Sequence, residues 1–190
     1  MSFERATLTK VELKTALSRA CRRPHKDVHK GKLVISPLAY NGPERETNLC
    51  ISPFAFLDCT GSIHIGPWCM LGPRSRVYTH DHIHAGRSRT LLETQEELGV
   101  VWQDKFLGAD VWIHDGAMVL YQVTRIPDGV VVGASAVLTK NPGPYEIWAG
   151  VPARKVGERT DDAVELSAKA EAEKRFLLPE SLIRAAKPGF

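Results

Sequence analysis

The sequence predicts an all-β core folded as a parallel β-helix of six-residue repeats, with a helix near each end of the chain. Two observations lead to this prediction: an aliphatic residue recurs at every sixth position, and the segments outside the repeat carry helix start and stop signals. A spacing of six does not suit an α-helix, whose period is about 3.6 residues, and it indicates a short strand followed by a turn.

The repeat runs through most of the central chain. Its clearest blocks open at Ile65, Leu71 and Val77. After an interruption, further blocks open at Leu107 and Ile126. Three such blocks form one triangular coil, in which the aliphatic side chain points inward and stacks on its counterpart about 4.8 Å along the axis. Burial then accumulates from coil to coil, as in other solenoids. The alternative is a β-sandwich with chance spacing, but the register holds across too many blocks for that.

One polar segment interrupts the repeat. The interruption, residues 83–106, lies between two blocks that are in register and is rich in arginine and glutamate. A long excursion from a regular scaffold is usually functional or disordered. We therefore expect this inserted loop to contribute to a functional site.

The terminal segments carry the helical signals. Thr9 and Glu12 form a capping-box pattern that predicts a helix to about Arg23. Near the other end, the stretch from Thr160 to about Leu178 is predicted to be helical, because acidic residues at its start suit the positive end of the helix dipole. The predicted organisation is an N-terminal cap, a β-helix and a C-terminal segment, at residues 1–49, 50–145 and 146–190.

Composition narrows the classes of function. The net charge is only +3, which is too weak to indicate a nucleic-acid-binding protein. No run approaches the roughly 18 apolar residues that a transmembrane helix needs, and the N-terminus has no apolar signal-peptide region. The four cysteines are not spaced C-x-x-C, so we interpret them as free thiols in a reducing compartment and expect a cytoplasmic location.

Three stretches resemble the hexapeptide-repeat acyltransferases, in particular the group that acetylates galactosides, maltose and nodulation factors. They span residues 65–82, residues 107–113, and residues 132–140 followed by 148–155. The resemblance covers roughly residues 50–160 and implies a left-handed β-helix. It also implies an acetyl-CoA-dependent O-acetyltransferase whose acceptor is a hydroxyl of a saccharide.

The same resemblance implies a histidine as the catalytic base. Counted from the Ile-Gly that opens the coil, His82 stands where the family has its base, and His80 is a close competitor. A hydroxyl is a poor nucleophile at neutral pH, and a neutral imidazole within hydrogen-bond reach takes its proton as it attacks the thioester carbonyl. The predicted catalytic residues are therefore His82 and His80.

Two further residues match positions near the family's acceptor. Asp58 stands where the family often has an Asn or Asp, and its role would be to bind the sugar or to orient the imidazole. Trp112 matches an aromatic residue near the pantetheine arm and the acceptor. Relatives commonly have glycine where this chain has His114, and the sequence assigns that histidine no role.

The coenzyme A site is predicted in the C-terminal part of the repeat. Ala134, Thr139 and Lys140 match positions that border the cofactor in the family. Arginine grips phosphate with two donors, and lysine adds a point charge. The basic side chains that suit the phosphates of coenzyme A are Arg154, Lys155 and Arg159.

Three alternatives remain open. A γ-class carbonic anhydrase uses a similar solenoid and binds zinc with three histidines, and the candidates here are His80, His82, His84 and His114. The His-x-x-x-x-His pair of that class is missing from the sequence, and we expect no metal. The second alternative is a non-catalytic scaffold. The third is N-acetylation of an amino sugar, or acetylation of an antibiotic, because the groups that catalyse these reactions resemble this chain over the same coils.

The family is also trimeric, and the flat sides of a triangular prism pack well around a threefold axis. The resemblance therefore implies a homotrimer with each active site between neighbouring subunits. The inserted loop would reach across that interface.

Overall fold

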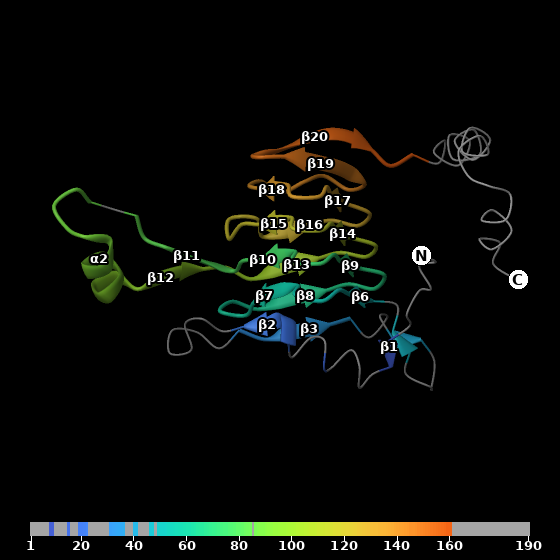
Figure 1. The fold of residues 1–190 in the computed structure, drawn as a ribbon, viewed down its shortest axis with the longest axis horizontal. Coiled ribbons are helices and arrows are strands. Elements are labelled where there is room, and N and C mark those ends of the chain that lie inside the picture. The colour runs from blue at the N-terminus through green and yellow to red at the C-terminus, as the bar shows by residue number, and fades with distance from the viewer. Residues whose placement is uncertain are drawn as a thin grey trace, which may run out of the picture. The chain divides into compact units, whose positions relative to one another are not determined.

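The computed structural model of the 190-residue chain describes residues 8–9, 15, 19–22, 31–36, 40–41, 46–47, 49–84 and 86–160. The chain divides into two compact units. The first comprises residues 6–158, and the second combines residues 1–5 with residues 159–190. The first unit contains all of the strands that follow (Figure 1).

Most of the first unit is a solenoid in which the chain passes in turn through three sheets, here named I, II and III. All pairings in these sheets are parallel except that of the last two strands of sheet I, which form an antiparallel hairpin. The strands of sheet I are β6 (Cys50–Ile51), β9 (Met70–Leu71), β14 (Trp112–Ile113), β17 (Val131–Val132), β19 (Glu146–Gly150) and β20 (Ala153–Glu158).

Sheets II and III complete each coil. Sheet II consists of β2 (Cys21–Arg22), β7 (Phe56–Asp58), β10 (Arg76–Val77), β15 (Met118–Val119) and β18 (Val137–Leu138). Sheet III consists of β3 (Leu33–Ile35), β8 (Ile63–Ile65), β13 (Lys105–Leu107) and β16 (Arg125–Ile126). The parallel sheets confirm the predicted repeat of one short strand and one turn.

The side chains that open the six-residue blocks point into the coils, as the sequence predicts. In sheet II, Leu57, Val77, Val119 and Leu138 follow one another in the strand register, and all four are fully buried. Burial of one such side chain contributes about 1.5–3 kcal/mol to folding. The corners hold smaller buried residues, namely Ala55, Cys69, Ala117 and Ala136.

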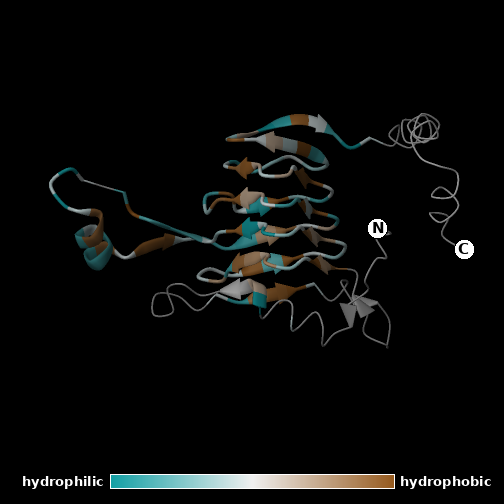
Figure 2. Cartoon of the chain, viewed as in Figure 1, coloured by the Kyte–Doolittle hydropathy of each residue, from teal (hydrophilic) through white to brown (hydrophobic). Residues whose placement is uncertain are grey.

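An arm leaves the coils between β10 and β13. It contains the antiparallel strands β11 (His80–His82) and β12 (Val100–Trp102), with the helix α2 (Leu91–Leu98) between them. The helix begins with a capping box between Thr90 and Glu93. Figure 1 shows the arm extending away from the stacked coils, and Figure 2 shows hydrophilic residues along the segment that leads to α2.

The N-terminal helix predicted to run to about Arg23 differs from the structure at its end, where Cys21 and Arg22 form the strand β2. Residues 8–9 form β1 (Leu8–Thr9), which pairs with β5 (Glu46–Thr47) beside β4 (Tyr40–Asn41) in a small antiparallel sheet. Thr15, Arg19 and Ala20 are helical, whereas Cys21 and Arg22 belong to a strand. The other residues of this segment lie outside the described ranges.

The physical reason for this difference lies at the open edge of sheet II. Cys21 and Arg22 pair in parallel with Leu57 and Asp58, and so extend that sheet by one strand. The backbone hydrogen bonds of a sheet edge outweigh a weak local preference for helix. The C-terminal helix predicted from residue 160 to about 178 lies almost wholly outside the described ranges.

The cysteines are not all free thiols, contrary to the prediction from the sequence. Cys59, which is fully buried in the coils, is disulfide-bonded. Cys50 and Cys69 are free, and burial raises the pKa of the Cys69 thiol to about 12. No described helix combines the length and the apolar character that crossing a membrane would require.

Close stacking of the coils generates a prediction about Gly66. A Cβ at this position would lie 2.3 Å from the carbonyl oxygen of Gly108 on the next coil, so the backbone would have to shift. We expect Gly66→Ala to lower the free energy of unfolding by about 1–3 kcal/mol, measured by urea denaturation. At Gly157 the nearest atom to such a Cβ is 4.0 Å away, in the Ile147 side chain. Gly157→Ala should therefore change stability by less than about 0.5 kcal/mol, and equal losses would contradict the argument.

Candidate active site

The residues with the clearest chemistry gather where the arm leaves sheet II. Asp58 is the last residue of β7, and Thr79 and His80 are where the chain departs from the next coil. The Thr79 hydroxyl accepts a hydrogen bond from the Gly61 amide at 2.8 Å. The Gln103 amide donates to the Thr79 carbonyl at 2.8 Å, so both strands of the arm are fixed at their base.

The Asp58 carboxylate is fully buried and accepts several hydrogen bonds. Its Oδ1 accepts from the backbone amide and the hydroxyl of Thr60, at 3.0 and 2.7 Å. Its Oδ2 accepts from the backbone amides of Thr79 and His80, at 2.9 and 3.0 Å. The same Oδ2 lies 2.5 Å from Nδ1 of the His80 ring.

These contacts control the charge of the carboxyl group. Burial raises the pKa of Asp58, but hydrogen bonds from His80, Thr60 and Thr79 oppose it and hold that pKa well below its ordinary value. Hydrogen bonds to the ionised form stabilise it in this way. Asp58 is therefore a carboxylate at neutral pH, and this carboxylate faces the imidazole of His80.

A carboxylate at Nδ1 orients His80. We assign the tautomer from this partner: Nδ1 carries the hydrogen that Asp58 accepts, and Nε2 is the basic nitrogen of the neutral ring. The His80 side chain is one-tenth exposed. An imidazole oriented by a buried carboxylate is an arrangement that suits general-base catalysis.

The neighbouring histidines differ in their surroundings. The ring of His82 meets that of His80 edge-on, with 5.6 Å between the centroids. His84 is more exposed, and its Nε2 lies 4.0 Å from Asp81 Oδ1. Among the described residues, no group of three or more histidine, cysteine, aspartate or glutamate side chains is arranged to hold a metal ion.

Lys105 is a buried charge that the sequence did not reveal. It occupies the inward position of β13 that Ile63 occupies on the previous coil. Its Nζ donates to the carbonyl oxygens of Leu120, at 3.0 Å, and of Tyr121 and Val123. Burial lowers the pKa of Lys105 to about 7, and the negative charge of Asp58 opposes this shift. The signal that could have indicated its burial is its position two residues before the inward-pointing Leu107 in the same strand.

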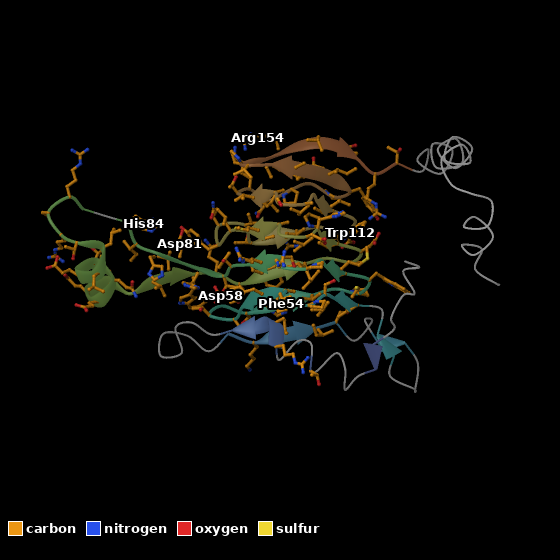
Figure 3. The ribbon with its side chains drawn as sticks, viewed as in Figure 1. Phe54, Asp58, Asp81, His84, Trp112 and Arg154 are labelled. Carbon is orange, nitrogen blue, oxygen red and sulfur yellow. The ribbon has the colours of Figure 1, made fainter. Side chains whose placement is uncertain are left out.

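Trp112 lies in sheet I, whereas Asp58 lies in sheet II. Figure 3 shows these two labelled side chains on different sides of the coils. The Trp112 ring stacks on His114, with centroids 3.7 Å apart and the planes 20° from parallel. One chain therefore does not bring Trp112 beside His80, and His114 serves as the stacking partner of the indole.

Five of the six predicted coenzyme A residues lie on the last coils and on the hairpin of β19 and β20. Ala134 and Lys140 are exposed on either side of β18, and Thr139 is half-buried. The Lys155 ammonium is paired with Glu158, and with Glu146 at 3.0 Å. Arg154 Nη1 donates to the carbonyl of Ala153 at 3.0 Å. The remaining predicted residue is Arg159, which belongs to the second compact unit.

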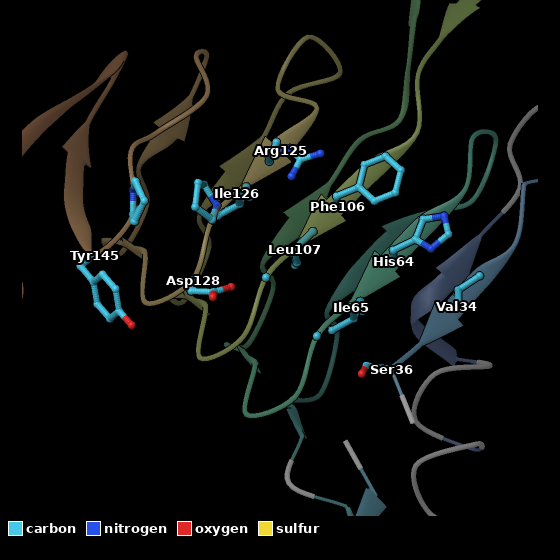
Figure 4. Close-up of a pocket in the computed structure, with 14 residues that line it drawn as sticks. Val34, Ser36, His64, Ile65, Phe106, Leu107, Arg125, Ile126, Asp128 and Tyr145 are labelled. Carbon is cyan, nitrogen blue, oxygen red and sulfur yellow. The ribbon is translucent and has the colours of Figure 1, made fainter. Parts of the chain in front are cut away.

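A groove of about 500 Å³ runs along the outer face of sheet III (Figure 4). The rings of His64 and Phe106 stack there with centroids 4.6 Å apart, and the Arg125 guanidinium lies 5.8 Å from the Phe106 centroid. Tyr145 and Asp128 line one end. The residues that line this groove include none of the predicted site residues.

Sequence comparisons find acetyltransferases over part of the chain. A chloramphenicol acetyltransferase from Agrobacterium fabrum (strain C58 / ATCC 33970) is 41% identical over 59 residues, which are 31% of this chain and 28% of that protein. Another from Klebsiella aerogenes is 41% identical over 61 residues, 32% of this chain and 29% of that protein. The chain thus spans less than a third of the length of the curated relatives that it matches. No family model matches it.

Solved structures with a similar fold include acetyltransferases. One from Vibrio cholerae O1 biovar eltor, complexed with acetyl coenzyme A, has a TM-score of 0.53 and 17% identity, covering 85% of this chain and 81% of that one. A galactoside acetyltransferase in complex with coenzyme A has a TM-score of 0.51 and 22% identity, covering 70% and 67%. At these identities the likeness establishes the fold.

Lys105 provides a test of the packing beneath the site. Lys105→Met would leave three carbonyl oxygens without their donor, and a buried polar group without a partner costs about 1–3 kcal/mol. We expect the free energy of unfolding to fall by about 3 kcal/mol or more, measured by chemical denaturation. The matched control is Lys32→Met at an exposed position, expected to cost less than about 0.5 kcal/mol. A loss at position 105 no larger than at the control would contradict this role.

The lowered pKa of Asp58 predicts how stability depends on pH. A carboxyl whose pKa is lower in the folded state stabilises that state above its unfolded pKa of about 4, and this contribution is lost as the pH falls through the folded value. The difference in unfolding free energy between the wild type and Asp58→Asn should be largest near neutral pH. It should shrink as the pH is lowered below about 4. A difference that stays constant down to acidic pH would refute the assignment.

Proposed function

We propose that this protein is an acetyl-CoA-dependent O-acetyltransferase on a left-handed β-helix, and that Nε2 of His80 is its general base. The observation that carries the proposal is the contact of 2.5 Å between the buried Asp58 carboxylate and His80 Nδ1. The motif count places His82 first, but His80 is the histidine whose ring a buried carboxylate orients. Asp58 accordingly acts as a positioning residue, because it is fully buried beneath the imidazole.

The proposed reaction proceeds by direct attack of the acceptor on acetyl-CoA. His80 Nε2 takes the hydroxyl proton while the acceptor oxygen bonds to the thioester carbonyl carbon. Asp58 stabilises the imidazolium that forms. The tetrahedral intermediate then collapses with cleavage of the carbon–sulfur bond. The imidazolium returns its proton to the coenzyme A thiolate, so the products are the acetyl ester and free coenzyme A.

Coenzyme A would bind along the last coils. The exposed Lys140 and the guanidinium group of Arg154 suit its phosphates, because charge-assisted hydrogen bonds to phosphate are strong. Ala134 and Thr139 would border the pantetheine and adenosine parts. Lys155 would have to exchange its contacts with glutamates for a phosphate, so we expect its contribution to be smaller.

Assembly into a homotrimer would complete the site. Trp112 and His80 lie on different sides of one chain, yet both are assigned to the same chemistry. A closed ring of subunits places one side of each chain against a different side of the next. In such a trimer, Trp112 of one subunit would face His80 of its neighbour.

The acceptor is proposed to be a saccharide hydroxyl, and a second candidate is a hydroxyl of chloramphenicol. The 41% identity with chloramphenicol acetyltransferases over 59 residues favours the second candidate, although it covers only 28% of that relative. An assay of coenzyme A release with acetyl-CoA and a panel of maltose, methyl β-D-galactopyranoside and chloramphenicol distinguishes the two. Absence of acceptor-dependent release, together with no binding of coenzyme A in calorimetry, would overturn the proposed function.

Substitution of the histidines tests the assignment of the base. His80→Ala should lower kcat by about 10²–10⁴ without changing the Kd of coenzyme A, because general-base catalysis contributes about that factor. His82→Ala should cost less, since it is the ring of His80 that contacts the buried Asp58 carboxylate. Asp58→Asn should also lower kcat, because the amide disfavours the tautomer that leaves Nε2 basic. A larger loss in His82→Ala than in His80→Ala would reverse the assignment.

A further inference from the structure

The two strands of the arm place an aromatic residue next to the proposed base. In the antiparallel pair of β11 and β12, His80 lies opposite Trp102, and His82 lies opposite Val100. Directly opposed residues project on the same face of a strand pair, with Cβ atoms about 4.5–5.5 Å apart. One face of the arm therefore carries both imidazoles together with an indole and an isopropyl group.

The indole remains partly open to solvent. Trp102 is 39% exposed, although a tryptophan has a large apolar surface that is normally buried. Its backbone is nevertheless held in place, because the arm is hydrogen-bonded at its base through Gln103 and Thr79 at 2.8 Å. The backbone that carries this partly exposed indole is thus held opposite His80.

We propose that Trp102 is a specificity-determining residue that stacks on the apolar face of a ring in the acceptor. This inference rests on the proposed function. It adds that the acceptor carries its hydroxyl on or beside a ring, either a pyranose or an aromatic ring. Both ring types have an apolar face that packs on an indole, and a hydroxyl at the ring edge is then directed toward His80.

The opposite face of the arm supplies a matched control. Val101 lies opposite Asp81, it belongs to the same strand as Trp102, and it is 37% exposed. Because neighbouring residues of a strand project to opposite faces, Val101 points away from the imidazoles. A loss of apolar surface at Val101 therefore reports general damage to the arm, whereas a loss at Trp102 reports contact with the acceptor.

The test compares Trp102→Ala, Trp102→Phe and Val101→Ala with the wild type, using methyl β-D-galactopyranoside, chloramphenicol and the acyclic butane-1,4-diol as acceptors. Trp102→Ala should raise the KM for the ring-bearing acceptor by roughly tenfold and leave the KM for acetyl-CoA unchanged. Trp102→Phe should restore most of the affinity, and Val101→Ala should leave KM as in the wild type. The galactopyranoside and chloramphenicol arms identify which kind of ring is bound.

Saturation-transfer NMR provides a readout that does not depend on turnover. Transfer from the wild type to the ring protons of an acceptor, lost in Trp102→Ala, supports the proposal. Equal binding by Trp102→Ala, an equal KM effect in Val101→Ala, or no preference for ring compounds over the diol overturns it. Absence of transfer to either ring compound also overturns it. Failure of acetyl transfer with intact ring binding would instead refute the proposed function.

Discussion

The stacking of inward aliphatic side chains from coil to coil is the constraint on which the other features depend. Each strand of the coils is two or three residues long, apart from β19 and β20 in the final hairpin, so no coil is stable alone. The apolar core continues from one coil to the next through side chains in strict register, namely Leu57, Val77, Val119 and Leu138. This register fixes the height of every outward residue along the axis, because adjacent coils are spaced by the strand-to-strand distance.

The candidate site occupies the point where this regularity is broken. When the chain leaves the coils after β10, at Thr79, its backbone amides lose the partners that a continuing coil would provide. The Asp58 carboxylate accepts from the amides of Thr79 and His80, and the same oxygen orients the His80 ring. Lys105, where the chain returns, donates to three carbonyl groups of the turn between β15 and β16. The Asp58 carboxylate that accepts from these amides therefore also holds the imidazole that we propose as the general base.

The arm and the last coils divide the proposed chemistry between them. His80, His82 and Trp102 stand on two short strands outside the coils, whereas Lys140 and Arg154 belong to the regular part of the fold. Two-stranded ribbons have little stability of their own, so the arm depends on the hydrogen bonds of Thr79 at its base. In this proposal, acceptor selection and coenzyme A binding reside on different elements and can therefore vary separately.

The six-residue period by itself determined which residues form the core, because an inward or outward direction is a local property of strand and turn. It also located the histidines at the end of a coil. The sequence did not determine that Asp58 meets His80 across 22 positions, that Lys105 is buried, or that Cys21 and Arg22 form a strand. Those facts depend on which backbone groups are left without partners where the arm departs and returns and at the open edge of sheet II. Only the folded path of the chain decides that.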